Sequence, residues 1–213
     1  MGGRDFKAEK LNAYEIGYRF WPHPGLVFDL AAFYNDYADL RSGLAAGSYT
    51  EEDPAPVHLV IPFEAVNLLE AETYGVELAA DWHSATLPWR CRAAYSYLQR
   101  QLHPGPGVDP VRGQGAEDEN PAHQFYVWSS ADLRRDIHLD GVARFVDRLP
   151  GHDFDAYLGL DLRLAWEPMD DVEIALVGRD LLNDHHPESR AFFVDTEPTE
   201  TQRSAYATLS WTF

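Results

Sequence analysis

The last residues of the chain, 201–213, alternate strictly between apolar and polar side chains. The apolar set is Ala205, Ala207, Leu209, Trp211 and Phe213. The polar set is Ser204, Tyr206, Thr208, Ser210 and Thr212. Only an extended strand separates two such sets onto opposite faces. In a soluble protein the apolar face of this strand would cover a core, whereas in an outer-membrane barrel it would face lipid. This segment alone is compatible with both.

The same two-residue period recurs along most of the chain. Its clearest instance places Leu158, Leu160, Leu162, Leu164 and Trp166 in alternation with Gly159, Asp161, Arg163 and Ala165. We expect nine strands, which begin near residues 11, 26, 58, 89, 122, 137, 158, 172 and 201. The third is expected to run from about 58 to 82 as one long strand with a bulge. Helical periodicity is nowhere sustained for about ten residues, so the sequence predicts an all-β fold.

The predicted connections alternate between short and long. Short turns are expected at 22–25, 84–88, 134–136 and 167–171, and longer loops at 41–57, 104–120 and 183–199. The link at 150–153 is the exception, because it is short where a long loop is due. Outer-membrane barrels have short periplasmic turns at one end and long outer loops at the other, an alternation that a Greek-key sandwich does not keep. The pattern therefore favours an antiparallel transmembrane β-barrel.

The tryptophans support the same fold. Five of the six lie beside a predicted short turn or at the end of the last strand: Trp21, Trp82, Trp89, Trp166 and Trp211. Tryptophans gathered at one level are typical of a membrane girdle, although large aromatics also cluster at the mouth of a soluble core. Charged residues such as Arg90, Arg92 and Arg163 lie on the face opposite the aromatics, which suits a water-filled lumen. We expect these arginines to pair with a plug domain or with acids on neighbouring strands.

Composition narrows the possible partners. The chain has 35 acidic and 17 basic residues and a formal net charge of -18. This charge would repel nucleic acid and anionic head groups, so no nucleic-acid partner is expected. The single cysteine, Cys91, excludes an internal disulfide framework. No apolar run of about 18 residues occurs, so a spanning helix is not expected, and no secretory signal pattern opens the chain.

The number of strands bears on the domain organisation. Bacterial single-chain barrels have an even number of strands. A nine-stranded chain whose last strand descends to the periplasm would have a first strand that also descends. We therefore expect the carboxy-terminal part of a larger up-and-down barrel, with residues 1–10 as a frayed start and 11–213 as barrel strands.

Several segments, taken together, resemble a known family. They are L-N-A-Y-E-I-G-Y-R, A-F-Y-N-D-Y-A-D-L, E-T-Y-G-V-E-L, G-R-D-L-L-N-D and the terminal S-W-T-F. In this order the chain resembles the carboxy-terminal part of the barrel of TonB-dependent outer-membrane receptors, over nearly all of residues 11–213. The plug domain and the TonB box of that family have no counterpart in these residues.

The resemblance implies a function and a set of partners. Members of such a family are plugged barrels of about 22 strands in the bacterial outer membrane. They import iron-siderophore complexes, cobalamin or similar scarce ligands. The implied partners are outer-membrane lipid, the plug domain and remaining barrel strands, the TonB complex acting through an amino-terminal part, and the barrel assembly machinery. Phe213 is the implied terminal assembly signal.

Histidines and acids gather at the predicted outer end. The ligand-contact candidates in the outer loops are His152, Asp153, His185 and His186. Neighbouring imidazole and carboxylate groups bind metals in many proteins. His185 and His186 are adjacent, which is not a ligand spacing specific to any metal, so neither a metal site nor a cofactor is predicted. Contact with a ligand through hydrogen bonds is the expectation that remains.

No catalytic motif appears. The sequence contains no G-x-S-x-G, no H-E-x-x-H and no glycine-rich phosphate loop, so an enzyme is not expected. Two alternatives to the transport receptor stay open. One is a soluble all-β binding module that is secreted or displayed on the cell surface, and the other is a small barrel with hydrolase activity.

Overall fold

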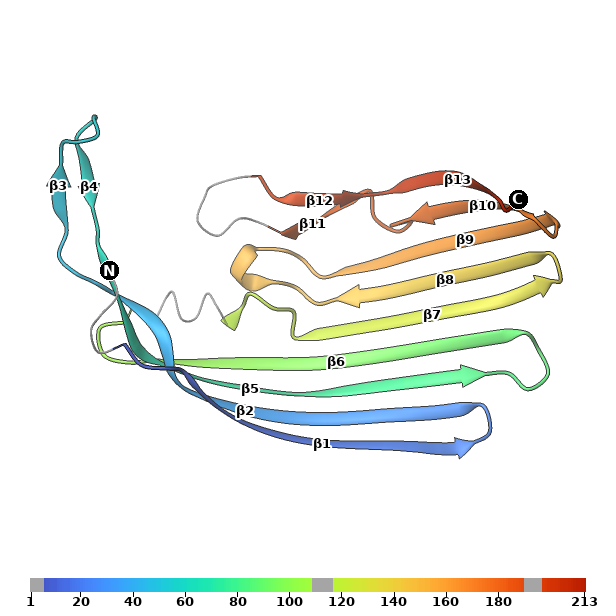
Figure 1. Ribbon diagram of the computed structural model, residues 1–213, viewed down its shortest axis with the longest axis horizontal. Helices are drawn as coiled ribbons and strands as arrows, with labels where there is room; N and C mark the ends of the chain where they lie inside the picture. Colours follow the sequence, from blue (N-terminus) through green and yellow to red (C-terminus); the bar gives the residue numbers. More distant parts are fainter. Residues whose placement is uncertain (1–5, 109–116, 190–196) are drawn as a thin grey trace. The chain divides into compact units, whose positions relative to one another are not determined.

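The computed structural model describes residues 6–108, 117–189 and 197–213. Its main element is a nine-stranded antiparallel sheet in the order β1-β2-β5-β6-β7-β8-β9-β10-β13 (Figure 1). The strands span Lys10–His23 (β1), Leu26–Ala45 (β2), Phe63–His83 (β5), Trp89–Pro104 (β6), His123–Arg134 (β7), Ile137–Val146 (β8), Tyr157–Met169 (β9), Val172–Arg179 (β10) and Ser204–Trp211 (β13). Each strand neighbours the sheet strand that precedes it in the chain. The predicted all-β, up-and-down order is confirmed.

Contacts within the chain divide it into two compact units. The first comprises Met1–Glu15, Phe33–Tyr74 and Gln99–Glu119. The second comprises Ile16–Ala32, Gly75–Leu98 and Asn120–Phe213. Strands β7 to β10 and β13 lie wholly in the second unit. Within the described ranges, no helix is both long enough and apolar enough to cross a membrane.

Short turns close one end of the strands in the second unit. They join β1 to β2, β5 to β6, β7 to β8 and β9 to β10, and Figure 1 shows them at the same end as the carboxy terminus. All four fall within the turns expected from the sequence. The β1–β2 turn requires a glycine, because Gly25 has a φ of +88° and a Cβ there would lie 2.7 Å from the carbonyl oxygen of His83.

The two faces of the sheet in the second unit are inverted relative to a soluble protein. On β9, β10 and β13, Leu164, Leu176 and Leu209 expose 44%, 60% and 71% of their surface. Ala165 and Ala175 lie opposite each other on the other face, and both are 0% exposed. The leucine face therefore covers no apolar core, and the face that also bears the charged residues is the more buried one.

The first unit contains a hairpin that the sequence pattern does not predict. Residues 58–82 were expected to form one bulged strand, and this prediction is wrong. Instead β4 (His58–Val60) pairs with β3 (Tyr49–Glu51), and β5 begins at Phe63. Pro62 precedes β5, and because proline has no N–H to donate it interrupts the ladder.

The amino-terminal residues of the first unit are tied to β5. Strand β1 begins at Lys10, one residue before the expected start. The Lys7 backbone N–H donates to Asn67 Oδ1 at 2.6 Å, and Asn67 Nδ2 donates to the Lys7 carbonyl at 3.1 Å. Residues 1–5 of the expected frayed start lie outside the described residues.

A second unpredicted hairpin lies in the connection between β10 and β13. It consists of β11 (His185–Ser189) and β12 (Thr199–Gln202), with His186 opposite Thr201. Residues 183–199 were expected to form a long loop, of which 190–196 lie outside the described residues. The last strand was expected from residue 201, whereas Thr201 and Gln202 belong to β12 and β13 begins at Ser204. The link between β8 and β9 contains a short 3-10 turn, Pro150–His152. In the loop expected at 104–120, residues 109–116 also lie outside the described residues.

Candidate functional site

Cross-strand ion pairs line one face of the second unit. Arg19 Nε lies 2.5 Å from Asp29 Oδ1 and joins β1 to β2. Arg92 Nε lies 2.5 Å from Asp81 Oδ1 and joins β6 to β5. Residues on one face of neighbouring strands stand close enough for such pairs to form. Each arginine thus has an acid from the adjacent strand as its partner.

Arg163 on β9 has two acidic partners. Its Nη1 lies 3.3 Å from Asp140 Oδ2 on β8, and its Nη2 lies 2.6 Å from Glu173 Oε2 on β10. Three strands are therefore joined through one guanidinium group. Arg90, which was also expected on this face, has its guanidinium carbon 5.9 Å from the centroid of the Trp128 ring.

Arg144 on β8 is the centre of the most buried ionic cluster. Its Nη1 lies 2.7 Å from Asp161 Oδ2 on β9, and its Nη2 lies 2.8 Å from Asp180 Oδ1, just after β10. The backbone N–H of Asp180 also donates to Asp161 Oδ1 at 2.9 Å. Asp180 is only 2% exposed and has a left-handed φ of 49°. We call these three residues the Arg144 cluster, and it fixes the point where the chain leaves β10.

Gly159 leaves the space that the Arg144 side chain occupies. Gly159 lies opposite Arg144 in the β8–β9 register. A Cβ at position 159 would lie 3.0 Å from Arg144 Nε and 3.1 Å from its Cζ. Real Cβ atoms seldom come this close, so the guanidinium group crosses β9 over the surface that glycine leaves free.

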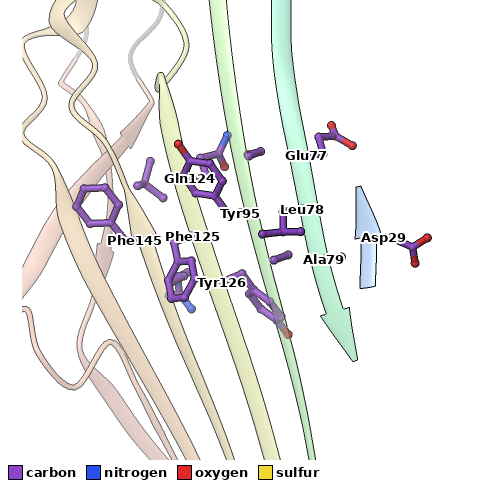
Figure 2. Close-up of a pocket in the computed structure, with 13 residues that line it drawn as sticks. Asp29, Glu77, Leu78, Ala79, Tyr95, Gln124, Phe125, Tyr126 and Phe145 are labelled. Atoms are coloured by element: carbon purple, nitrogen blue, oxygen red, sulfur yellow. The ribbon is translucent and has the colours of Figure 1, made fainter. Parts of the chain in front are cut away.

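A groove of about 390 Å³ lies beside the Arg144 cluster (Figure 2). Its lining comes from β2, β5, β6, β7 and β8, and Figure 2 shows Asp29 and Glu77 on one side and Phe145 on the other. In the register, Ala94 lies opposite Tyr126, which lies opposite Arg144. Successive residues of a strand point to opposite faces, so Ala94 and Tyr126 share the face of Arg144. The groove therefore opens on the charged face, above small side chains.

The five predicted girdle tryptophans all lie at the short-turn end of the second unit. Trp21, Trp82 and Trp166 lie near the ends of β1, β5 and β9, Trp89 opens β6, and Trp211 ends β13. The rings of Trp82 and Trp89 meet edge to face, with centroids 5.2 Å apart.

Two of these indole groups also donate hydrogen bonds. Trp89 Nε1 donates to Ser129 Oγ at 2.9 Å, and Trp211 Nε1 donates to Asp171 Oδ2 in the β9–β10 turn at 3.1 Å. Phe213, the predicted assembly signal, is fully exposed.

The structure separates the predicted ligand contacts. His185 and His186 are consecutive residues of β11 and so point to opposite sides, His185 exposed and His186 only 5% exposed. His152 lies in the 3-10 turn, where its ring stacks on Phe154 with centroids 5.6 Å apart. Asp153 follows with a left-handed φ of 58°. Among these four residues, all within the described ranges, no hydrogen bond or ion pair joins one to another.

His186 belongs to a cluster that sequence reasoning missed. Its ring stacks on Tyr157 at a centroid distance of 3.9 Å, and its Nε2 lies 2.8 Å from Glu188 Oε1. Thr201 Oγ1 donates to the same Glu188 oxygen at 3.4 Å. The Nδ1 atom of His186 is buried without a hydrogen-bond partner. The signal available in the sequence was the H-x-E spacing, which places two side chains on one side of a strand.

A metal centre is not assembled by the side chains in view. In the part of the chain that the structure describes, no group of three or more His, Cys, Asp or Glu side chains is placed to hold a metal ion. The Arg144 cluster was also missed as a unit, because the alternation around Leu160 placed Asp161 opposite the leucines but gave no sign that Arg144 and Asp180 would meet it, and Asp180 was noted only within the G-R-D-L-L-N-D segment.

Comparison with known proteins gives one family match. A model described as TonB-dependent receptor-like, β-barrel matches residues 1–181. Among curated proteins no sequence matches the chain.

Several solved structures share the fold. The ferric-catecholate import receptor Fiu from E. coli K12, in its closed form, is 18% identical, with a TM-score of 0.73 over 98% of this chain and 28% of its own. The pyoverdine outer membrane receptor FpvA from Pseudomonas aeruginosa PAO1 is 16% identical, with a TM-score of 0.71 over 98% and 30%. The FrpB iron transporter from Neisseria meningitidis is 14% identical, with a TM-score of 0.70 over 99% and 32%. The chain thus spans less than a third of the length of each of these proteins.

Proposed function

The chain belongs to the TonB-dependent receptor-like β-barrel family and is a bacterial outer-membrane protein, and on that premise we propose that it contributes part of the wall of a transporter. The transporter would take up a scarce ligand such as a metal chelate, an iron-siderophore complex or cobalamin, with energy supplied through the TonB complex. We further propose that residues 11–213 are the carboxy-terminal strands of its barrel.

One observation carries this proposal. Leu164, Leu176 and Leu209 are exposed on one face, while Arg144 and Arg163 on the other face are held by acids from neighbouring strands. In a barrel with a water-filled lumen, apolar side chains face the lipid and charged side chains face the lumen. In a soluble binding module, the apolar face would instead be buried in a core and the charged face would be exposed. The short turns and the tryptophans at one end of the second unit are consistent with the same placement.

The kind of ligand is suggested by the proteins that share the fold. Their descriptions name ferric catecholate, pyoverdine, iron and copper. We propose a metal or metal-chelate ligand on this basis. A plug domain, further barrel strands, the TonB complex and the barrel assembly machinery are the proposed partners.

We assign the outer ligand contacts unequally. His185 is exposed on β11, whereas the imidazole of His186 is engaged by Tyr157 and Glu188. His185, with His152 and Asp153, is therefore the better candidate for direct contact with a ligand. His186 would act by holding β11 in place. Replacing His185 by Ala in the intact receptor is expected to weaken binding of the imported chelate, and unchanged affinity would remove His185 from the site.

The proposed transport is tested in cells that depend on this receptor. Deletion of the gene is expected to abolish uptake of at least one labelled chelate from a panel of iron, copper and cobalamin compounds, and restoration of the gene is expected to recover it. A receptor that stays folded and monodisperse in buffer without detergent would instead favour the soluble binding module. Uptake of the whole panel at unchanged rates after deletion would contradict the transport proposal.

The residues at the short-turn end of the second unit lead to a separate proposal about assembly. Trp21, Trp82, Trp89, Trp166 and Trp211 would form the membrane girdle, since indole rings favour the interface. Phe213 would serve as the terminal assembly signal. Removing Phe213 alone is expected to lower the amount of receptor recovered in the outer membrane. Removal of Phe6, which is also exposed, is the matched control and is expected to leave this amount unchanged. Equal recovery of both variants would contradict the role of Phe213.

A further inference from the structure

The groove on the charged face has a particular balance of charge. Asp29, Glu77 and Arg144 are the ionisable acids and bases that line it, together with the phenol of Tyr126, whereas Tyr95 points to the opposite face. A single arginine among two carboxylates would suit an anionic ligand only if its guanidinium group were free. The contacts of Arg144 therefore decide which sign of charge the groove accepts.

Arg144 is already neutralised. Its Nη1 and Nη2 each hold a carboxylate, at 2.7 Å and 2.8 Å, and both acids belong to the Arg144 cluster. The cluster as a whole thus carries one more negative than positive charge. Asp29 is likewise held by Arg19 at 2.5 Å. No cation of the groove is left to bind an incoming anion.

Glu77 is the carboxylate that remains available. It is exposed on β5, and within the described residues it has no hydrogen bond or ion pair. Arg163, on the same face, also has two carboxylate partners, so this group too carries one negative charge in excess. A polyanion near this wall would meet repulsion at each of these points.

An aromatic ring adds to this selectivity. Tyr126 lines the groove on the same face as Arg144 and is 38% exposed. The face of a phenol ring attracts ammonium groups within about 6 Å of its centroid. Ala94 and Ser96, which are small, leave the space beside it open.

We propose that this groove binds the positively charged group of a ligand, with Glu77 as the charge partner and Tyr126 as the aromatic surface. The ligand class is an organic ammonium compound, or a chelate that carries such a group, and not a polyanionic chelate. This inference rests on the proposed function only for the identity of the groove as part of a transport path. Binding of a small ammonium ion to the groove is measurable without transport.

The test compares two aromatic ions of similar size and opposite charge, benzylammonium and benzoate. Equilibrium dialysis against the intact receptor in detergent is expected to detect benzylammonium and not benzoate. Glu77→Gln is expected to weaken benzylammonium binding roughly two- to fivefold, which is the upper part of the range for an exposed charge contact. Tyr126→Leu is expected to act similarly, and Tyr126→Phe to retain binding, because the ring is kept.

The matched control is Glu167→Gln. Glu167 is an exposed acid of β9 that does not line the groove, so this variant should bind benzylammonium like the unchanged receptor. Equal affinity for the two ions, or a Glu77→Gln variant with unaltered affinity, would overturn the proposal. Binding that appears only after another segment of the receptor has been cut away would overturn it too, since the groove would then be filled by the receptor itself.

The result separates the groove from the transport function. Benzylammonium binding through Glu77 in a receptor that imports no chelate would support the groove and remove the transport proposal. Uptake of a chelate by a receptor whose groove binds neither ion would do the opposite. A matched pair for the uptake assay is a ferric trihydroxamate with one free ammonium group and the same chelate with that amine acetylated, of which the first is expected to enter faster.

Discussion

The two faces of β9 and β10 follow opposite rules. On one face Leu164 and Leu176 lie opposite each other and are largely exposed. On the other face Ala165 and Ala175 are fully buried, and Asp161 and Arg163 are half-buried, whereas Leu162 and Leu164 are exposed. The same two strands thus have an apolar face and a polar face, and the apolar leucines are the more exposed residues.

This difference shows which interactions stabilise the sheet. Packing of leucines against one another cannot stabilise the charged face, because the leucines are on the opposite face. Backbone pairing and cross-strand ion pairs remain, of which the Arg144 cluster is the most buried. A substitution on the leucine face should therefore be judged by its effect on transfer to lipid, and one on the charged face by the partners it leaves unpaired.

The largest effect is expected at the Arg144 cluster. Arg144→Met removes the cation that neutralises Asp180, whose carboxylate is almost fully buried. We expect the free energy of unfolding to fall by about 3 to 5 kcal/mol, the usual cost of a buried charge left alone. Denaturant titration in detergent micelles measures this change.

A companion variant checks the cause. When Asp161→Asn and Asp180→Asn are added to Arg144→Met, no charge is left uncompensated, and most of the lost stability should return. If the triple variant is no more stable than Arg144→Met alone, the loss would reflect packing and not charge.

The next effect separates the two faces directly. Leu162→Arg places a guanidinium group on the leucine face of β9, deeper in the membrane than the girdle residue Trp166, and the expected cost is about 2 to 4 kcal/mol when that face meets lipid. Ser210→Arg is the control on the opposite face, because Ser210 lies opposite Glu173 in the register. Unfolding in lipid bilayers compares the two variants, and equal costs would refute the assignment of the faces.

The smallest effect concerns the glycine beneath Arg144. Gly159→Ala adds a Cβ about 3 Å from the guanidinium group, and the crowding should cost about 1 to 3 kcal/mol. Gly17→Ala is the control, since a Cβ there meets its nearest neighbour, the carbonyl oxygen of Leu30, at 3.5 Å. Thermal unfolding of both variants measures the difference. A Gly159→Ala protein that matches the Gly17→Ala protein would show that Arg144 has another path.

The strand faces were predictable from the sequence because a period of two needs only residue order. The alternation around Leu160 and Asp161 is sufficient to assign both sides of β9. The two small hairpins were not predictable. Strands such as His58–Val60 are too short for a period to appear, and proline at 62 reads equally well as a bulge in a longer strand.

The candidate site was predictable only in part. The outer histidines were identified by position, but adjacent residues on a strand point to opposite sides, so His185 and His186 cannot serve one ligand together. The Arg144 cluster depends on the register that brings 144, 161 and 180 together. Composition does not encode such a register, and the left-handed bend at Asp180 has no sequence signal stronger than the residue type.

The close approach of the Arg144 side chain to Gly159 has a consequence for sequence evolution as well as for stability. Residue 159 needs to be glycine only while residue 144 has a long side chain that lies across it. In homologues that have lost the arginine, residue 159 should be free to acquire a side chain, and the two acids should vanish with their cation. Positions 144, 159, 161 and 180 are thus expected to change together among homologues. Such covariation would reveal a contact that cannot be recognised in one sequence alone.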